Sequence, residues 1–183
     1  QSRGNFEADA LDEYWGIKAG EQGASVQDAL AMGWRLGFVA GTDNHQGHPT
    51  QQPGGYIGMT CFRAADLTRE DIWQAMDERR TYATSGVPIV CDFSVNGIQS
   101  GAEGRGHDEV AFSAVLHGTA PIERVEIISQ ERCIWQDEPN AWDVEIDGQE
   151  LPKLAGTSAY YYLRLRQQDG HRAWLSPVLL DRA

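Results

Sequence analysis

The sequence predicts an α/β region followed by an all-β region, and two observations support that division. Before Gly86-Val87-Pro88, short helical and strand patterns alternate, whereas almost every later segment alternates apolar and polar residues at period two. Turn dipeptides such as Asn96-Gly97 and Asp169-Gly170 separate the later segments, as in antiparallel hairpins. We therefore expect two domains, residues 1–87 and residues 88–183, of which the second is a small Ig-like antiparallel β-sandwich.

The first region contains two predicted helices and two predicted strands. Ser25 begins a capping pattern for a helix that Gly33 ends, and Leu36–Ala40 form a buried apolar strand. Residues 56–62 form the second strand, and Thr68 caps the second helix. This order of elements is of the α/β type, but about 87 residues are too few for a closed α/β barrel, which takes ~250 residues.

The second region contains six or seven predicted short strands. Their apolar residues alternate with polar ones, so that each strand buries one face. The patterns cover residues 89–95, 110–116, 125–127, 142–146, 161–165 and 173–180.

Composition limits the classes of function. The formal net charge of -12 argues against nucleic acid as a main partner, because phosphate binding needs a basic surface. No apolar run approaches the roughly 20 residues of a membrane span, so a soluble chain is expected. Gln1 is not an initiator Met and begins no signal peptide, so we expect a C-terminal fragment or a processed chain. The compartment, cytoplasmic or exported, is left open.

Three cysteines limit the metal sites and disulfides that the chain could form. Cys61, Cys91 and Cys133 are an odd, widely spaced set without a C-x-x-C pair, which favours buried free thiols over a zinc site or a disulfide framework. A Cys91–Cys133 bridge is the alternative for an exported protein.

Candidate metal ligands follow the first predicted strand. Residues i and i+2 of an extended chain point to the same side, so Asp43 and His45 would aim a carboxylate and an imidazole at one point. This pair commonly binds Zn, Mn or Fe. The alternative is a turn in which Asp43 or Asn44 caps the next segment. His48, in the Gly- and Pro-rich loop that follows, is either a third ligand, an acid or base, or a solvated loop residue, and the last interpretation is favoured.

A candidate anion site lies at the end of the second helix. Arg79 and Arg80 stand next to four hydroxyl-bearing side chains within the stretch that ends at Gly86. A guanidinium pair in such a setting suits phosphate or carboxylate recognition. Spacing alone favours the alternative, a solvated helix end that runs into a turn.

Aromatic residues of the second region suggest a different class of function, a binding module. Alternation places Tyr160 and Tyr162 on the face opposite Tyr161, so one of the two faces is expected to be exposed or docked. Docking against the α/β region is favoured over a sugar-stacking surface. Three tryptophans belong to the same region: Trp135, Trp142 and Trp174.

Several of these stretches, in their order, resemble the end of a PHP (polymerase and histidinol phosphatase) domain. They are Gly41–His45, Pro53-Gly54-Gly55, Asp66–Glu70 and Arg79–Gly86. The most similar branch carries a small β-domain after the PHP domain, and Asp92–Gly97 and Trp174–Pro177 resemble that β-domain.

The resemblance implies a partial (βα) PHP-type barrel segment in the first region and phosphoesterase activity in the parent protein. Two or three divalent metal ions (Zn, Mn or Fe) would activate water and screen the phosphate charge. Asp43 and His45 would be metal ligands, and Arg79 or Arg80 would contact a small phosphorylated substrate. The His-x-His motif and the other ligands of the family have no match in this chain.

The missing ligands lead to three further expectations. The site is incomplete, so the chain alone should bind metal weakly and should be inactive. Its partner would be the missing N-terminal part of the barrel, and exposed strand edges should make the fragment self-associate. The alternatives are a non-catalytic binding or docking module and a degenerate PHP relative with a structural role.

Overall fold

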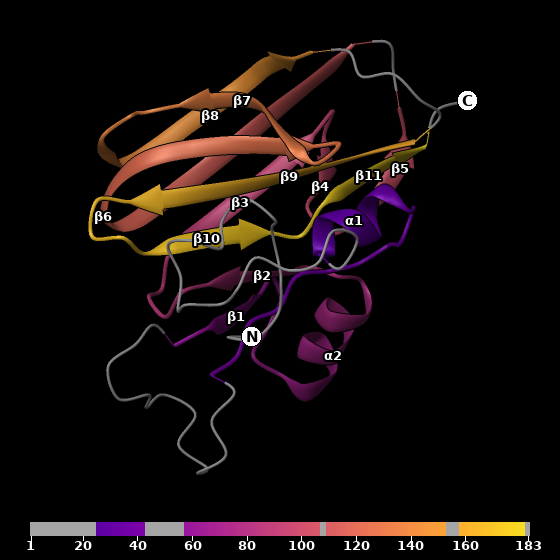
Figure 1. The fold of residues 1–183 in the computed structure, drawn as a ribbon. Helices are drawn as coiled ribbons and strands as arrows, with labels where there is room; N and C mark the ends of the chain where they lie inside the picture. Colours follow the sequence, from indigo (N-terminus) through magenta and orange to yellow (C-terminus); the bar gives the residue numbers. More distant parts are fainter. Residues whose placement is uncertain (1–24, 43–56, 107–108, 153–157, 182–183) are drawn as a thin grey trace.

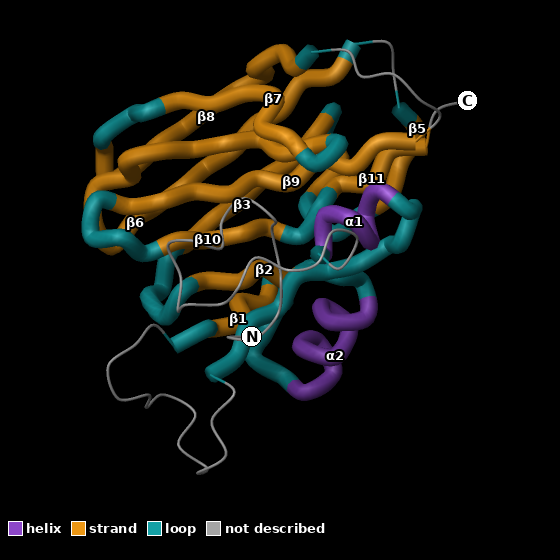
Figure 2. Tube along the Cα trace, in the orientation of Figure 1, coloured by secondary structure: helices purple, strands orange, loops and turns teal. Residues whose placement is uncertain are grey.

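A computed structural model describes residues 25–42, 57–106, 109–152 and 158–181. In these residues two short helices accompany a single connected sheet of eleven strands, and both helices lie at one side of it (Figures 1 and 2). Every strand pair is antiparallel except β5 with β11. The elements are α1 (Val26–Ala31), β1 (Met59–Phe62), α2 (Arg69–Asp77), β2 (Thr81–Thr84), β3 (Val90–Val95), β4 (Ile98–Gln99), β5 (Glu103–Arg105), β6 (Val110–Ser129), β7 (Arg132–Asp137), β8 (Ala141–Leu151), β9 (Ser158–Gln167), β10 (Arg172–Leu175) and β11 (Val178–Asp181).

The prediction of a (βα) barrel segment in the first region is wrong. A βαβ unit needs parallel strands, but β1 and β2, which flank α2, pair antiparallel with Met59 opposite Thr84. β2 also pairs with β10, so these strands extend the sheet of the second region. The predicted strand Leu36–Ala40 has no strand hydrogen bonding and lies beside this sheet as an irregular segment. A pattern of alternating helices and strands does not fix the direction in which the chain returns.

The starts of both helices are confirmed. The Ser25 hydroxyl accepts a hydrogen bond from the Asp28 amide (3.1 Å), and the Asp28 carboxylate accepts one from the Ser25 amide (2.7 Å). This reciprocal pair is a capping box. In α2 the Thr68 hydroxyl accepts a hydrogen bond from the Asp71 amide at 3.1 Å. Such contacts lie within four residues of the chain, so the sequence alone specifies them.

The β-sandwich prediction holds only in part, because the strands form one curled sheet instead of two separate ones. The cause is β6, a strand of 20 residues. Its first half pairs with β3 and β8, and its second half pairs with β7 and β9. The register shifts between His117 and Ile122, where Gly118 and Pro121 interrupt the apolar alternation. β6 therefore passes from one layer to the other, and the sheet closes over a shared core (Figure 1).

The buried side chain of Gln167 stabilises this bend. Its Oε1 accepts hydrogen bonds from the amides of Thr119 (2.8 Å) and Ala120 (3.4 Å). These two amides lie within the stretch where the register between β6 and β8 shifts, and Gln167 supplies them with an acceptor. A side chain on Gly118 would collide with the Ala120 carbonyl oxygen and with Gln167, and the bend therefore requires glycine there.

Both faces of β9 are buried, each by a different cluster. Tyr161 belongs to the main core between the two halves of the sheet. Tyr160 and Tyr162 lie on the opposite face and pack against α1 and the segment that follows it. The Gln27 side chain donates a hydrogen bond to the Tyr162 hydroxyl (2.8 Å), and the Phe38 ring meets the Tyr162 ring edge to face at 5.2 Å. The predicted docking of this tyrosine face against the first region is confirmed.

A buried cluster of hydroxyl groups attaches the irregular segment to the sheet. Ser176, between β10 and β11, accepts a hydrogen bond from the Phe38 amide (2.7 Å) and donates one to the Thr81 carbonyl oxygen (2.6 Å). Thr81 donates in turn to the Phe38 carbonyl oxygen at 2.9 Å. The Ser100 hydroxyl donates to the Ser176 carbonyl oxygen at 2.7 Å. Four separate parts of the chain thus meet at Ser176.

Neither described helix has the length and hydropathy needed to cross a membrane.

Replacing Ser176 with alanine should lower the free energy of unfolding by about 1–3 kcal/mol, because the buried Phe38 amide and Thr81 carbonyl both lose a partner. Urea denaturation followed by circular dichroism measures this change. The control is Ser94→Ala on the half-exposed side of β3, which should change stability by less than about 0.5 kcal/mol. Equal stability of the two variants would contradict the proposed role of Ser176.

Candidate functional site

The candidate site is the end of the sheet at which four chain segments meet, and we refer to it as the converging edge. It consists of Gly41-Thr42, Ile57-Gly58, Thr84–Gly86 and His171-Arg172. Close approach requires glycine at two of its positions. A Cβ on Gly58 would lie 2.7 Å from the Gly41 carbonyl oxygen, and one on Gly86 (φ +107°) would lie 2.5 Å from that of Ile57. The backbone segments therefore touch directly, with no side chains between them.

Thr60 fixes the segment that leads to the converging edge. Its hydroxyl accepts a hydrogen bond from the Ala40 amide (2.9 Å) and donates one to the Ala40 carbonyl oxygen (2.8 Å). Phe38 is held at the Thr81 end of β2, and Gly41 lies at the end where β2 reaches Thr84. The segment therefore runs alongside β2 in the same direction and delivers Thr42 to the converging edge. A lone threonine in a strand gives no signal of this role in the sequence.

A serine–histidine contact lies on the β10 side of the converging edge. The Ser85 hydroxyl is 3.0 Å from His171 Nδ1, and it accepts a hydrogen bond from the Arg172 amide at 2.8 Å. Ser85 is buried and its amide donates to the Arg172 carbonyl oxygen at 3.0 Å. A serine nucleophile needs an accessible oxygen. This pair instead joins β2 to β10, and we assign it a structural role.

The predicted metal ligands Asp43 and His45, and His48, lie outside the described residues. Within the described ranges, no group of three or more His, Cys, Asp or Glu side chains could hold a metal ion. The described residues therefore do not fit a multi-metal centre. Together with the β-rich fold, this contradicts the prediction of a metal-binding PHP-type barrel domain for the described residues.

The two arginines predicted to contact an anion have partners within the protein. Arg79 Nη2 lies 2.6 Å from Glu103 Oε1, and its Nε donates to the Gly101 carbonyl oxygen at 3.1 Å. Arg80 Nε lies 2.9 Å from Glu78 Oε2. An incoming phosphate would have to compete with these carboxylates, so recognition of an anion by Arg79 or Arg80 stays a prediction.

Arg35, a residue that the sequence analysis did not single out, extends the ion pairs of Arg79. Its guanidinium contacts Glu103 and lies 2.7 Å from Asp181 on β11. The hydrogen bond to Asp181 raises the pKa of Arg35 above its ordinary value. The group links the segment after α1 to β5 and β11, which supports attachment of the first region to the sheet.

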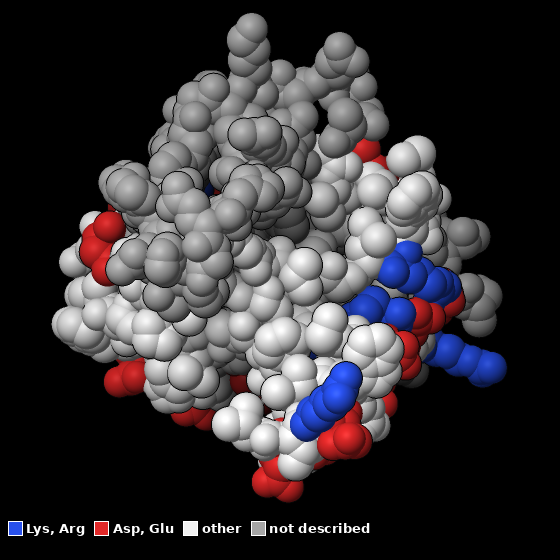
Figure 3. All heavy atoms as spheres, turned by 90° about the horizontal axis from the view of Figure 1, so that it is seen from below, with Lys and Arg blue, Asp and Glu red and all other residues white. Residues whose placement is uncertain are grey.

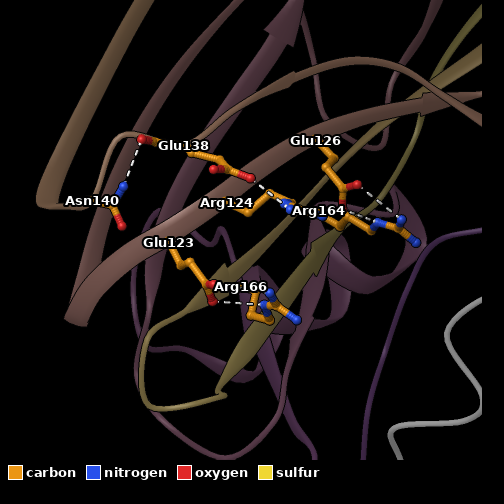
Figure 4. Close-up of polar contacts among 7 residues, drawn as sticks. All are labelled: Glu123, Arg124, Glu126, Glu138, Asn140, Arg164 and Arg166. Atoms are coloured by element: carbon orange, nitrogen blue, oxygen red, sulfur yellow. Dashed lines mark hydrogen bonds and ion pairs between the residues drawn. The ribbon is translucent and has the colours of Figure 1, made fainter.

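A ladder of opposite charges crosses the outer face of β6 and β9 (Figure 4). Arg164 Nε lies 2.7 Å from Glu126 Oε2, and this pair is mostly buried, with 16% and 14% of the two side chains exposed. Glu123 pairs with Arg166 at 2.9 Å, and Arg124 pairs with Glu138 at 2.7 Å. Cross-strand pairs of this kind stabilise a sheet. Each carboxylate faces a guanidinium, so we assign the ladder to stability.

A hollow of about 200 Å³ lies beside α1, away from the converging edge. Leu30, Trp34, Arg35, Tyr160 and Asp181 contribute to its wall. Its polar groups already bind one another: Arg35 pairs with Asp181, and the Tyr160 hydroxyl accepts a hydrogen bond from the Glu131 amide at 2.7 Å. The hollow therefore presents no convergent set of available polar groups, and the converging edge remains the candidate site.

The cysteines are free thiols with different exposure. Cys91 is buried, Cys61 is half-buried and Cys133 is exposed, so the prediction of buried free thiols holds for Cys91 alone. Burial raises the pKa of all three thiols above the ordinary value. A raised pKa lowers the thiolate fraction and hence the reactivity.

Replacing Glu126 with glutamine should lower the free energy of unfolding by about 1–2 kcal/mol, because Arg164 would lose its ionic partner in a mostly buried position. The matched control is Glu138→Gln in the exposed pair with Arg124, for which we expect a loss below about 0.5 kcal/mol. Urea denaturation at low ionic strength measures both. A larger loss for Glu138→Gln would argue against burial as the source of the difference.

Titration with Ellman's reagent at pH 8 should reveal three thiols that react at different rates. Cys133 should react first in the native protein, Cys61 more slowly, and Cys91 only after unfolding in urea. The total in urea tests the pairing directly, because a Cys91–Cys133 disulfide would leave a single titratable thiol. Rapid reaction of Cys91 in the native protein would contradict its burial.

Comparison with known proteins identifies relatives in Chlamydia species. No family model matches the chain. A protein of Chlamydia trachomatis described as "Uncharacterized protein" is 28% identical over 179 residues, and one of Chlamydia muridarum is 26% identical over 186 residues. Each alignment covers 86% of this chain and 29% of the relative, so the chain spans less than a third of the length of these curated relatives. A solved structure of fibronectin(III)-like modules of Clostridium thermocellum CbhA covers 49% of this chain and is itself covered over 94%. It has 18% identity and a TM-score of 0.33, which is too low to indicate a shared fold.

Proposed function

We propose that this chain belongs to a larger hydrolase, a phosphoesterase, in which its described residues are non-catalytic and its converging edge supports the active site. The observation that carries the proposal is the meeting of Gly41-Thr42, Ile57-Gly58 and Thr84–Gly86. Two of these belong to stretches that resemble motifs of metal-dependent phosphoesterases, and the third follows such a stretch within two residues. These segments are 15 or more residues apart in the sequence, and their meeting at one edge allows them to position a neighbouring group together.

The support offered by this edge is mechanical. The backbone contacts at Gly58 and Gly86 and the hydrogen bonds of Thr60 hold Thr42 in a fixed place, one residue before Asp43 in the sequence. A catalytic or metal-binding group must be held to within a fraction of an ångström by rigid surroundings. The converging edge offers surroundings of that kind, because backbone contacts and the Thr60 hydrogen bonds build it.

Two features support a non-catalytic role for the described residues themselves. The Ser85 hydroxyl is buried and hydrogen-bonded, and Arg79 and Arg80 are paired with carboxylates of the chain. The remaining reactive groups of a hydrolase would then come from outside the described ranges. The curated relatives are more than three times as long as the part that this chain matches, which leaves ample sequence for them.

A sugar-stacking module has weaker support. Tyr160, Tyr161 and Tyr162 expose 5%, 0% and 0% of their surfaces, so this aromatic run offers no face to a ligand. Trp142 is exposed, but a single ring does not make a stacking platform.

The test compares this chain with the longer polypeptide, purified in parallel. We expect about two or more transition-metal ions per longer polypeptide by plasma mass spectrometry, and hydrolysis of bis(p-nitrophenyl) phosphate. This chain alone should show neither. In the longer polypeptide, Asp43→Ala and His45→Ala should each reduce kcat/KM at least about a hundredfold, because the loss of a metal ligand exceeds the effect of removing an outer-shell partner.

Asp137→Ala is the matched control, since this exposed carboxylate on β7 lies far along the sheet from the converging edge. It should leave metal content and activity unchanged. Full activity and full metal content after both Asp43→Ala and His45→Ala would refute the proposal.

A further inference from the structure

Exposed apolar side chains are concentrated in one part of the molecule. Of the eleven large hydrophobic side chains that are exposed in the described part of the chain, eight belong to residues 25–42 and 57–86. The much longer range from residue 87 to residue 181 contributes only three. The eight are Met32, Trp34, Val39, Met59, Phe62, Leu67, Trp73 and Met76.

Helix α2 is the centre of this concentration. It has nine residues, and Ala75 is its one buried side chain, whereas Trp73 and Met76 are 69% and 48% exposed. A helix of this length is marginal without tertiary packing, and its stability normally comes from burying an apolar face. The outer face of α2 carries a large aromatic and a large aliphatic side chain that pack against nothing comparable within the described residues.

Two further exposed apolar side chains belong to β1 and to the link between β1 and α2. Phe62 ends β1 with 39% of its side chain exposed, and Leu67, just before the helix cap, is 94% exposed. α2 lies beside β1, at the end of the sheet (Figure 1). Seen from below, side chains of both charges lie next to one another along one flank of the described surface, beside a broad uncharged area (Figure 3). We call Phe62, Leu67, Trp73 and Met76 the α2–β1 face.

Charge indicates what this face can meet. The formal net charge of the chain is -12, but residues 57–86 contain four arginines and five acidic residues, a net charge of -1. Two copies of the chain would bring together two bodies of charge -12, which opposes self-association. A nearly neutral face with exposed apolar side chains suits an apolar partner surface that does not carry this excess of negative charge.

We propose that the α2–β1 face packs against another part of the longer polypeptide, through an apolar and uncharged surface of that part. This inference rests on the proposed function only in its premise that the chain is part of a larger protein. The curated relatives match 86% of this chain with 29% of their own length, so a large remainder is covalently available to them. Covalent linkage gives such a remainder a high effective concentration, and a modest apolar contact is then sufficient.

Hydroxyl-radical footprinting with peptide mass spectrometry tests the proposal on this chain and on the longer polypeptide. Oxidation of Trp73 and Met76 should be at least about fivefold slower in the longer polypeptide, because the centre of an interface excludes water. Trp142, which is 56% exposed on β8, is the matched control and should be oxidised equally in both. Equal oxidation of Trp73 in the two proteins would overturn the proposal.

A pair of variants separates docking from folding. Trp73→Ser combined with Met76→Ser should leave the urea midpoint of this chain unchanged, because both side chains are exposed in it, and should lower that of the longer polypeptide. Trp142→Ser should change neither. An unchanged midpoint in the longer polypeptide would count against the proposed contact.

Light scattering on the same samples shows whether the α2–β1 face is covered by another part of the same polypeptide or by a second copy. Protection of Trp73 in a monomeric longer polypeptide supports the proposal, whereas protection that disappears on dilution together with a dimer would assign the face to a second copy and overturn it. Phosphoesterase activity is not a readout here. If the longer polypeptide shows no hydrolase activity but Trp73 is protected in it, this inference therefore stands. If the longer polypeptide is active but Trp73 is not protected, this inference alone is refuted.

Discussion

The hydroxyl group of Ser176 is the point on which the arrangement of the first region depends. It accepts the Phe38 amide hydrogen and donates to the Thr81 carbonyl oxygen, in a position with no exposure to solvent. Phe38 lies in an irregular segment that is not part of a strand, and these bonds attach that segment to the sheet. Once Phe38 is fixed, the Thr60 hydroxyl can bind both the amide and the carbonyl oxygen of Ala40, and the chain reaches the converging edge in one defined place.

Packing of β9 decides which surfaces of the molecule remain exposed. Tyr161 fills the core of the curled sheet, and Tyr160 and Tyr162 on its other face are covered by α1 and Phe38. α1 can cover this face because Gln27 satisfies the Tyr162 hydroxyl there. The sheet thus uses both faces of its central strand internally. Of the large apolar side chains that remain exposed, those of α2 and β1 lie at the end of the sheet that no described strand continues.

Most of the arginines among the described residues form ion pairs with carboxylates of the chain. Arg35 and Arg79 share Glu103, and Arg164 faces Glu126 across two strands. A surface arranged in this way contributes stability and has little free charge with which to hold an anionic substrate. The converging edge is different in kind, because backbone contacts and hydroxyl groups build it. Positioning, rather than chemistry, is the contribution that such an edge can make to a larger protein.

The sequence by itself determined the local features of this protein. Ser25 and Thr68 cap their helices, and Asn96-Gly97 turns β3 into β4 with φ values of +50° and +76°, because each of these structures depends on residues within four positions of one another. Only the tertiary structure decided that β1 and β2 run antiparallel, that β6 bends between two layers, and that Arg79 binds Glu103. These features join residues 19 to 41 positions apart, or depend on strand direction. Periodicity specifies which side of a strand is buried without specifying its neighbour. The apolar alternation of the second region therefore predicted its strands, whereas the barrel expected from the first region was wrong. The position of the converging edge depends on contacts with Ser176 and β10, which the sequence did not predict.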